Sequence, residues 1–89
     1  VSVNIVTGID AQSNHVLKIL NSILELLSLG FENVAKSTIY LTSLGNFKMV
    51  NEIYEKWLGV CRPARATVQV AALPLGAEVE IEMIAVRPK

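Results

Sequence analysis

The sequence has few of the residues on which common catalytic centres depend. It contains one cysteine, which excludes an intrachain disulfide and makes a reducing compartment, the cytoplasm, the expected location. No spacing typical of a metal site, a phosphate-binding loop or a Ser-His-Asp triad is present. No apolar run approaches the ~20 residues of a membrane span, and no signal peptide is visible. A membrane partner and a metal cofactor are therefore not expected.

Charge is also scarce, and it is balanced. Only 18% of the residues are charged, with 8 basic and 8 acidic side chains. Nucleic-acid binding normally needs a basic patch, so a nucleic-acid partner is not expected. By contrast, 52% of the 89 residues are hydrophobic, which is more than so small a body can hide alone. The composition predicts one small domain, residues 1–89, with apolar surface that faces another subunit.

The first half of the chain shows the period of an amphipathic helix. Apolar residues recur every three to four positions between residues 11 and 29, which predicts a helix there. Asp10 is the expected N-cap, and Gly30 is the expected stop signal. Residues 1–6 fit the end of a strand or a loop.

The middle of the chain predicts a strand and a second helix. Residues 34–42 alternate between two faces, as a strand does, and Asn46 can cap a helix that runs to about Leu58, before Gly59. A strand, a helix and a further strand in this order imply a right-handed crossover and a parallel pair. We therefore expect an α+β fold, a mixed sheet with both helices on one face.

The last third of the chain, RPARATVQVAALPLGAEVEIEMIAV over residues 62–86, predicts two strands. Residues 64–72 and 78–86 have strand character, and Pro74 and Gly76 break the pattern between them. A connection of five residues between two such runs predicts an antiparallel hairpin. The second run places Glu78, Glu80 and Glu82 on one face.

Parts of this stretch resemble the C-terminal signature of a known family. The family is that of the reactive-intermediate deaminases, also called YjgF, with the older names L-PSP endoribonuclease and perchloric-acid-soluble translation inhibitor. The matching segments keep their spacing without gaps: Pro63-Ala64-Arg65, Val68, Val70, Leu73-Pro74, Val79-Glu80-Ile81-Glu82 and Ile84-Ala85. The resemblance implies a chorismate-mutase-like fold, a homotrimer with sites between subunits, and no cofactor. It also implies that an N-terminal β-hairpin and a further strand are missing here.

Arg65 is the first candidate site residue. A guanidinium is a planar fork that binds carboxylates through two hydrogen bonds and stays charged. From the residues alone, a salt bridge to Glu78, Glu80 or Glu82 is the simpler interpretation. The resemblance instead implies that Arg65, in the Pro-Ala-Arg triplet, holds the carboxylate of a small substrate.

Three further residues take roles from the resemblance. Glu80 is the first glutamate of the Glu-Ile-Glu run and would position the attacking water; by itself it fits a strand residue in solvent. Asn51, in the helical motif Val50-Asn51 followed by Tyr54, would line the site. Thr67 falls where many relatives carry Cys or another small residue, and its backbone carbonyl would help to hold the water.

The predicted hairpin separates the two principal candidates. With Leu75 near the centre of the turn, Arg65 faces about position 85 and Glu80 about position 70. The two would lie ~17 Å apart along the sheet, too far to touch one small substrate. We therefore expect neighbouring subunits to contribute them to a shared site.

These expectations combine into one functional hypothesis with two rivals. The hypothesis is a metal-free deaminase that hydrolyses reactive enamines and imines of the 2-aminoacrylate type to 2-keto acids and ammonia. The first rival is the endoribonuclease and translation-inhibitor activity in the family's older names, against which the neutral charge argues. The second is a non-catalytic trimer that binds small carboxylates, for which Arg65 alone would suffice.

Overall fold

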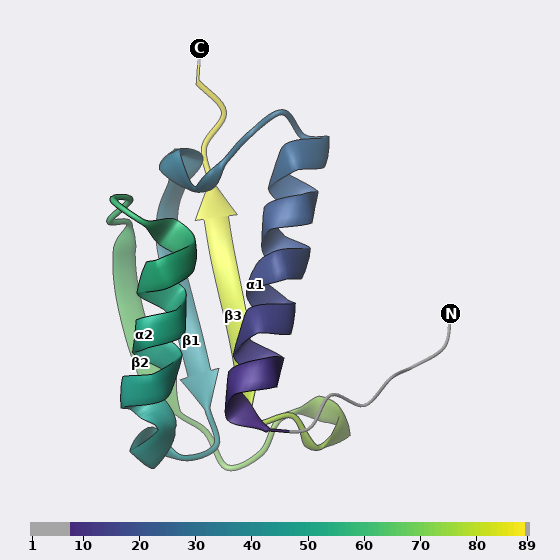
Figure 1. The fold of residues 1–89 in the computed structure, drawn as a ribbon, viewed down its shortest axis with the longest axis vertical. Coiled ribbons are helices and arrows are strands. Elements are labelled where there is room, and N and C mark those ends of the chain that lie inside the picture. The colour runs from purple at the N-terminus through teal and green to yellow at the C-terminus, as the bar shows by residue number, and fades with distance from the viewer. Residues whose placement is uncertain (1–7, 89) are drawn as a thin grey trace.

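The computed structural model describes residues 8–88, which form two helices, three strands and three short 3-10 helices (Figure 1). The 3-10 helices are Phe31–Asn33, Leu44–Asn46 and Pro74–Gly76. The interpretation of residues 1–6 lies outside the described residues. The expected order helix, strand, helix, strand, strand is confirmed, with these bounds: α1 (Ile9–Leu26), β1 (Val34–Leu41), α2 (Phe47–Leu58), β2 (Ala64–Gln69) and β3 (Val79–Ala85).

The sheet has the order β2-β1-β3, so β1 is its central strand. β2 runs parallel to β1, with Arg65 opposite Ser37, which confirms the predicted parallel pair. β3 runs antiparallel to β1 on the other side, with Met83 opposite Ser37. The predicted hairpin between residues 64–72 and 78–86 is therefore wrong, because β1 lies between β2 and β3.

The connection between β2 and β3 passes around the end of β1. The N–H of Val70 donates to the carbonyl of Leu41 at 2.8 Å on one side, and the N–H of Thr42 donates to the carbonyl of Glu78 at 3.2 Å on the other. Residues 73–77 turn as predicted, but the connection spans two strand spacings instead of one. Both strands are shorter than predicted. The connection therefore comprises residues 70–78 and is long enough to pass β1.

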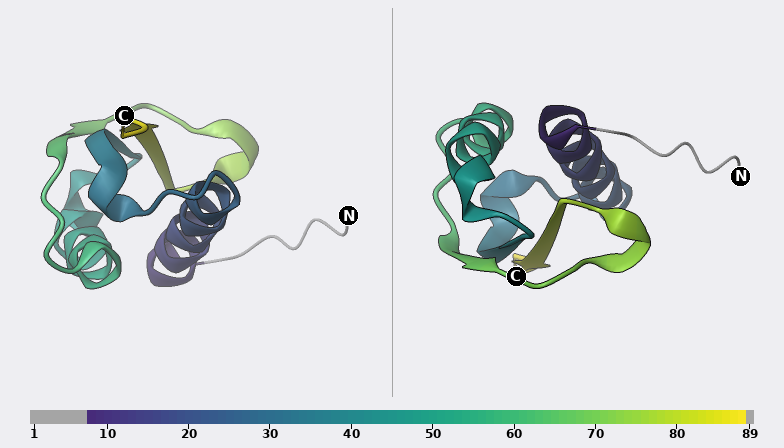
Figure 2. Two further views of the ribbon diagram at one scale, coloured as in Figure 1. Left: turned by 90° about the horizontal axis from the view of Figure 1, so that it is seen from above. Right: turned by 90° about the horizontal axis from the view of Figure 1, so that it is seen from below.

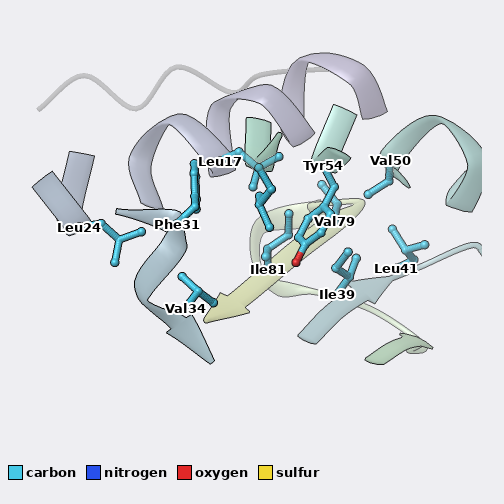
Figure 3. Packing of buried hydrophobic residues seen from close by; sticks show 11 residues of the cluster. Leu17, Leu24, Phe31, Val34, Ile39, Leu41, Val50, Tyr54, Val79 and Ile81 are labelled. Atoms are coloured by element: carbon cyan, nitrogen blue, oxygen red, sulfur yellow. The ribbon is translucent and has the colours of Figure 1, made fainter. Parts of the chain in front are cut away.

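Both helices lie on one face of the sheet, as predicted (Figure 2). α1 packs against β3 and α2, and α2 reaches β1 through Tyr54. Figure 3 shows the apolar side chains that meet between the layers. The buried core consists of these residues: Leu17, Leu24, Phe31, Val34, Ile39, Leu41, Val50, Tyr54, Leu58, Val79 and Ile81.

The ends of α1 differ from the prediction. The helix begins one residue earlier than Asp10, which lies in the first turn, and its N-cap is Gly8, without a side-chain hydrogen bond. At the other end, Ser28 adopts the left-handed conformation with φ of 59°. The N–H of Leu29 then donates to the carbonyl of Leu24 at 2.8 Å, which closes the last turn before Gly30 is reached. Gly30 is therefore not the stop residue.

The ends of α2 agree better with the prediction. Gly59 ends the helix with φ of 61° and ψ of −118°, a conformation that suits glycine. Asn46 is the N-cap by position, but its side chain makes no capping hydrogen bond. No helix among residues 8–88 combines the length and the apolar character that crossing a bilayer requires.

The face of the sheet that points away from the helices is called the open face here. Side chains that are neighbours across a sheet point to the same side, and Ser37 points to the helices, so the alternate positions form the open face. Arg65, Thr67 and Gln69 lie on the helix side of β2, so the residues between them lie on the open face. The open face consists of Lys36, Thr38 and Tyr40 from β1, Ala64, Ala66 and Val68 from β2, and Glu80, Glu82 and Ile84 from β3.

Candidate functional site

The connection from α2 to β2 sets the place of Arg65. Gly59 turns the chain out of the helix, and the guanidinium of Arg62 donates to the carbonyls of Gly59 at 2.5 Å and Cys61 at 3.0 Å. Pro63 supplies no N–H, which suits the entry to an edge strand. Arg65 follows as the second residue of β2, with its side chain on the helix side of the sheet.

The Arg65 guanidinium lies against one stripe of α2. Its Nη1 donates a hydrogen bond to Oδ1 of Asn51. The guanidinium carbon also lies 5.7 Å from the centre of the Phe47 ring and 5.2 Å from the centre of the Tyr54 ring. Phe47, Asn51 and Tyr54 stand four and three residues apart on the helix, so they share one face. Two cation–π contacts and one hydrogen bond therefore hold this cation.

Tyr54 is itself held from the sheet. Its hydroxyl lies 2.7 Å from Oγ of Ser37, and this hydrogen bond is buried. Ser37 is fully buried and Tyr54 is only 5% exposed. Since Ser37 is also the neighbour of Arg65 across the sheet, the three residues form a closed set of contacts.

No acidic side chain among residues 8–88 forms an ion pair with Arg65. Glu80 and Glu82 point to the open face, whereas Arg65 points to the helices. The salt-bridge interpretation of Arg65 is therefore not what the structure shows. The exposed guanidinium instead borders a cavity of about 290 Å³, lined by Tyr54, Glu55, Cys61, Arg62, Pro63 and Arg65. Its remaining N–H groups are free to receive an anion from that side.

Glu80 lies on the other face of the sheet from Arg65. It is exposed and stands opposite Tyr40, which in turn stands opposite Val68 of β2. Arg65 is level with Ser37, three residues away along β1, and two strand spacings separate β2 from β3. Those spacings place the two backbone positions ~14 Å apart. Within one chain, a small molecule cannot touch both side chains.

The structure brings Asn51 to Arg65, whereas the side chain of Thr67 is enclosed and its expected role through the backbone carbonyl stays a prediction. Thr67 follows Arg65 by two residues and shares its face of β2. Its Oγ1 is buried and has no hydrogen-bond partner within residues 8–88. A hydroxyl enclosed in this way does not face the cavity beside Arg65, so a role for Thr67 in binding falls to its backbone.

The cysteine and the histidine of the chain do not form a cluster with each other. Cys61 is partly buried and packs against the apolar core, and His15 is exposed on α1. In the part of the chain that the structure describes, no three or more His, Cys, Asp or Glu side chains come together as metal ligands would.

Sequence reasoning missed the surroundings of Arg65. The sequence indicates Tyr54 only as part of the helical motif around Asn51, and it gives Phe47 and Ser37 no role beyond their places in a predicted helix and a predicted strand. The signal in the sequence is a serine and a tyrosine at core-facing positions. Their hydroxyls need hydrogen-bond partners inside the core. Here they bond to each other beside Arg65.

Comparisons with known proteins give one consistent result. The family model described as Endoribonuclease L-PSP matches residues 2–87. The chain is 48% identical over 78 residues to Reactive Intermediate Deaminase A, chloroplastic, of Arabidopsis thaliana, which covers 88% of this chain and 42% of that protein. It is 45% identical over 80 residues to the mouse 2-iminobutanoate/2-iminopropanoate deaminase, covering 90% of this chain and 59% of that protein.

Solved structures show the same fold. A protein of Thermotoga maritima described as a putative endoribonuclease superposes with a TM-score of 0.92 at 41% identity, over 97% of this chain and 68% of that chain. Escherichia coli TdcF with bound serine superposes with a TM-score of 0.90 at 32% identity, over 96% of this chain and 69% of that one. The chain thus spans about two fifths to three fifths of the length of these two curated relatives.

Proposed function

The chain belongs to the Endoribonuclease L-PSP family, which includes the reactive-intermediate deaminases, and we propose that it hydrolyses small enamines and imines that carry a carboxylate. The observation that carries the proposal is the state of Arg65. Its guanidinium is exposed, held by a neutral amide and two rings, and not paired with an acidic residue within residues 8–88. Because this cation is oriented, exposed and without an acidic partner among the described residues, it can bind a carboxylate that arrives from solution.

The proposed reaction needs an anchor and a positioned water. Arg65 binds the substrate carboxylate, with Asn51 beside it. Glu80 and a backbone carbonyl near Thr67 orient a water for attack on the imine carbon. The water oxygen forms a bond to that carbon and the two protons of the water pass to the nitrogen. The carbon–nitrogen bond then breaks, so that ammonia and a 2-keto acid are released. Orientation and charge complementarity supply most of the rate, because such compounds already hydrolyse in water.

We propose that two chains build each site within a homotrimer. Arg65 and Glu80 lie on opposite faces of one sheet, so a second copy must bring its Glu80 to the first copy's Arg65. Exposed apolar side chains among the polar and charged residues of the open face support this arrangement. Val68 is 41% exposed and Ile84 is 54% exposed there, which is costly to leave in water. Escherichia coli TdcF, a relative whose structure holds bound serine, supports a ligand with an amino-acid carboxylate.

The proposed location is the cytoplasm, for which the single cysteine is the only support. One relative is named as chloroplastic, so this location stays a prediction.

The deciding experiment is a coupled assay in which a threonine dehydratase generates the imine in place. Ammonia and 2-keto acid release is followed with and without the protein, and with its Arg65→Ala and Glu80→Gln variants. We expect acceleration by the unchanged protein, none by Arg65→Ala, and a turnover number about 10²- to 10⁴-fold lower for Glu80→Gln.

The same variants separate the rival functions. A carboxylate-binding trimer without catalysis would bind pyruvate through Arg65 but leave the release rate unchanged. An endoribonuclease would cleave RNA with a strong salt dependence and would be insensitive to imine supply. Absence of any acceleration by the unchanged protein contradicts the deaminase proposal.

A further inference from the structure

The contacts around Arg65 point to two residues that act through it. We propose that Ser37 and Tyr54 are positioning residues: their hydrogen bond fixes the Tyr54 ring as a wall against which the Arg65 guanidinium takes the orientation that a carboxylate needs. The inference rests on the proposed function, in which Arg65 receives the substrate carboxylate. It adds a reason why that cation is already oriented before the ligand arrives.

The geometry makes a closed set of contacts. Ser37 and Arg65 are neighbours across the parallel pair of β1 and β2. Ser37 bonds to the Tyr54 hydroxyl at 2.7 Å, and the Tyr54 ring centre lies 5.2 Å from the guanidinium carbon. The sheet therefore fixes one end of this set and the helix fixes the other, so the position of the ring depends on both layers.

The guanidinium of Arg65 needs a fixed ring beside it because the arginine side chain is long and has many rotamers. An arginine loses rotamer entropy when it is held in one conformation. The single hydrogen bond to Asn51 fixes one nitrogen, but it leaves the plane of the guanidinium free to rotate about that contact. Two rings limit that rotation. Phe47 is 37% exposed, whereas Tyr54 is 5% exposed and bonded through its hydroxyl, so Tyr54 is the firmer of the two.

A purely structural role explains the pair less well. An alanine and a phenylalanine in these two positions would fill the same core without any polar group to satisfy. Replacing both partners of a buried hydrogen bond by apolar groups can be nearly neutral for stability. The hydroxyl pair is therefore not needed to keep the layers together, whereas it does fix the ring next to Arg65.

The test uses the full chain and two variants, Tyr54→Phe and the double variant Ser37→Ala/Tyr54→Phe. The single variant leaves the buried Ser37 hydroxyl without its partner, which lowers the melting temperature. The double variant removes both hydroxyls and regains most of that stability. In each protein, ¹⁵N relaxation of the Arg65 Nε–Hε group reports on the order of the side chain, calorimetry gives the affinity for pyruvate, and the coupled assay gives kcat and KM.

If Tyr54 positions Arg65, both variants loosen the guanidinium. The order parameter of the Arg65 Nε–Hε group then falls into the mobile range, below about 0.6. The Kd for pyruvate and the KM for the imine rise together by about fivefold, while kcat stays constant, because uniform binding is lost. These effects persist in the double variant although its stability has recovered.

A structural role gives a different pattern. An unchanged order parameter, or a pyruvate affinity that returns to normal together with stability in the double variant, overturns the inference. Ser13→Ala is the matched control, since Ser13 is equally buried and its hydroxyl donates to the carbonyl of Ile9 at 2.6 Å on α1. This control is expected to lose stability without any change in Arg65.

The relaxation measurement also separates this inference from the proposed function. If the unchanged protein neither binds pyruvate nor accelerates imine hydrolysis, the proposed function fails. A fall in the Arg65 order parameter in both variants would then still establish that Ser37 and Tyr54 orient this side chain.

Discussion

Arg65 and Glu80 occupy opposite faces of one three-stranded sheet, with β1 between their strands. A site that uses both must combine two chains, which predicts complementation between inactive variants. Arg65→Ala and Glu80→Gln chains are each inactive as homotrimers. After unfolding and refolding together in equal amounts, about one quarter of the sites in a three-fold assembly receive an intact Arg65 and an intact Glu80. We expect the kcat of the mixture to be about one quarter of the kcat of the unchanged protein.

The control is the double variant Arg65→Ala/Glu80→Gln refolded with either single variant. Such mixtures contain no chain pair with both groups and should stay inactive. Activity in none of the mixtures would contradict a site shared between chains.

The planar pair of N–H donors on the Arg65 guanidinium, and not its charge alone, is expected to determine the affinity for pyruvate. Arg65→Lys keeps the positive charge but cannot bind a carboxylate through two parallel hydrogen bonds, and it loses the contact with the rings of Phe47 and Tyr54. We expect pyruvate affinity to fall by at least about tenfold in this variant, as measured by calorimetry. Melting temperatures should stay close to that of the unchanged protein, because Arg65 is exposed. A lysine variant with full affinity would show that charge alone is sufficient.

The open face is expected to be the surface on which copies assemble. Val68→Glu places a charge on that face, where burial against another copy would leave it unpaired. We expect this variant to remain folded by circular dichroism and to lose the three-chain mass in light scattering. Leu26→Glu is the control, since Leu26 is 85% exposed at the end of α1 on the opposite side of the molecule. Equal masses for the two variants would argue against the open face as the interface.

Gly59 is expected to be intolerant of any side chain for backbone reasons alone. Its φ of 61° and ψ of −118° are costly for other residues, and a Cβ there would meet no atom within 4 Å. Gly59→Ala should therefore lower the free energy of unfolding by about 1–3 kcal/mol, measured by urea denaturation. Gly45→Ala, at a glycine whose φ lies outside the left-handed region, should have a smaller effect. A neutral Gly59→Ala would mean that the α2–β2 connection relaxes easily.

The type and order of the elements could be predicted because their periods are visible in the sequence. The neighbours in the sheet could not. The turn at residues 73–77 carries the same Pro and Gly signals whether it closes a hairpin or passes around another strand. Burial of β1 decides between the two, since Ser37, Ile39 and Leu41 are at most 1% exposed and this strand pairs along both edges.

The candidate site was predictable in its residue types but not in its orientation. Arg65 and Asn51 were singled out separately, and the structure shows that they touch. Which face of β2 Arg65 occupies depends on the register with β1, and a shift of one residue would have sent it to the open face. Ser37 carries that information, because a buried hydroxyl beside Tyr54 fixes which side of β1 meets α2.

The central place of β1 has a consequence for how the chain is made. During synthesis β1 leaves the ribosome before β2 and β3, and β3, the partner of its second edge, emerges after β2. Until then that edge can pair with strands of other growing chains. A ribosome that stops before Val79 therefore releases a chain with an unfinished core, and the yield of folded protein depends on synthesis through β3.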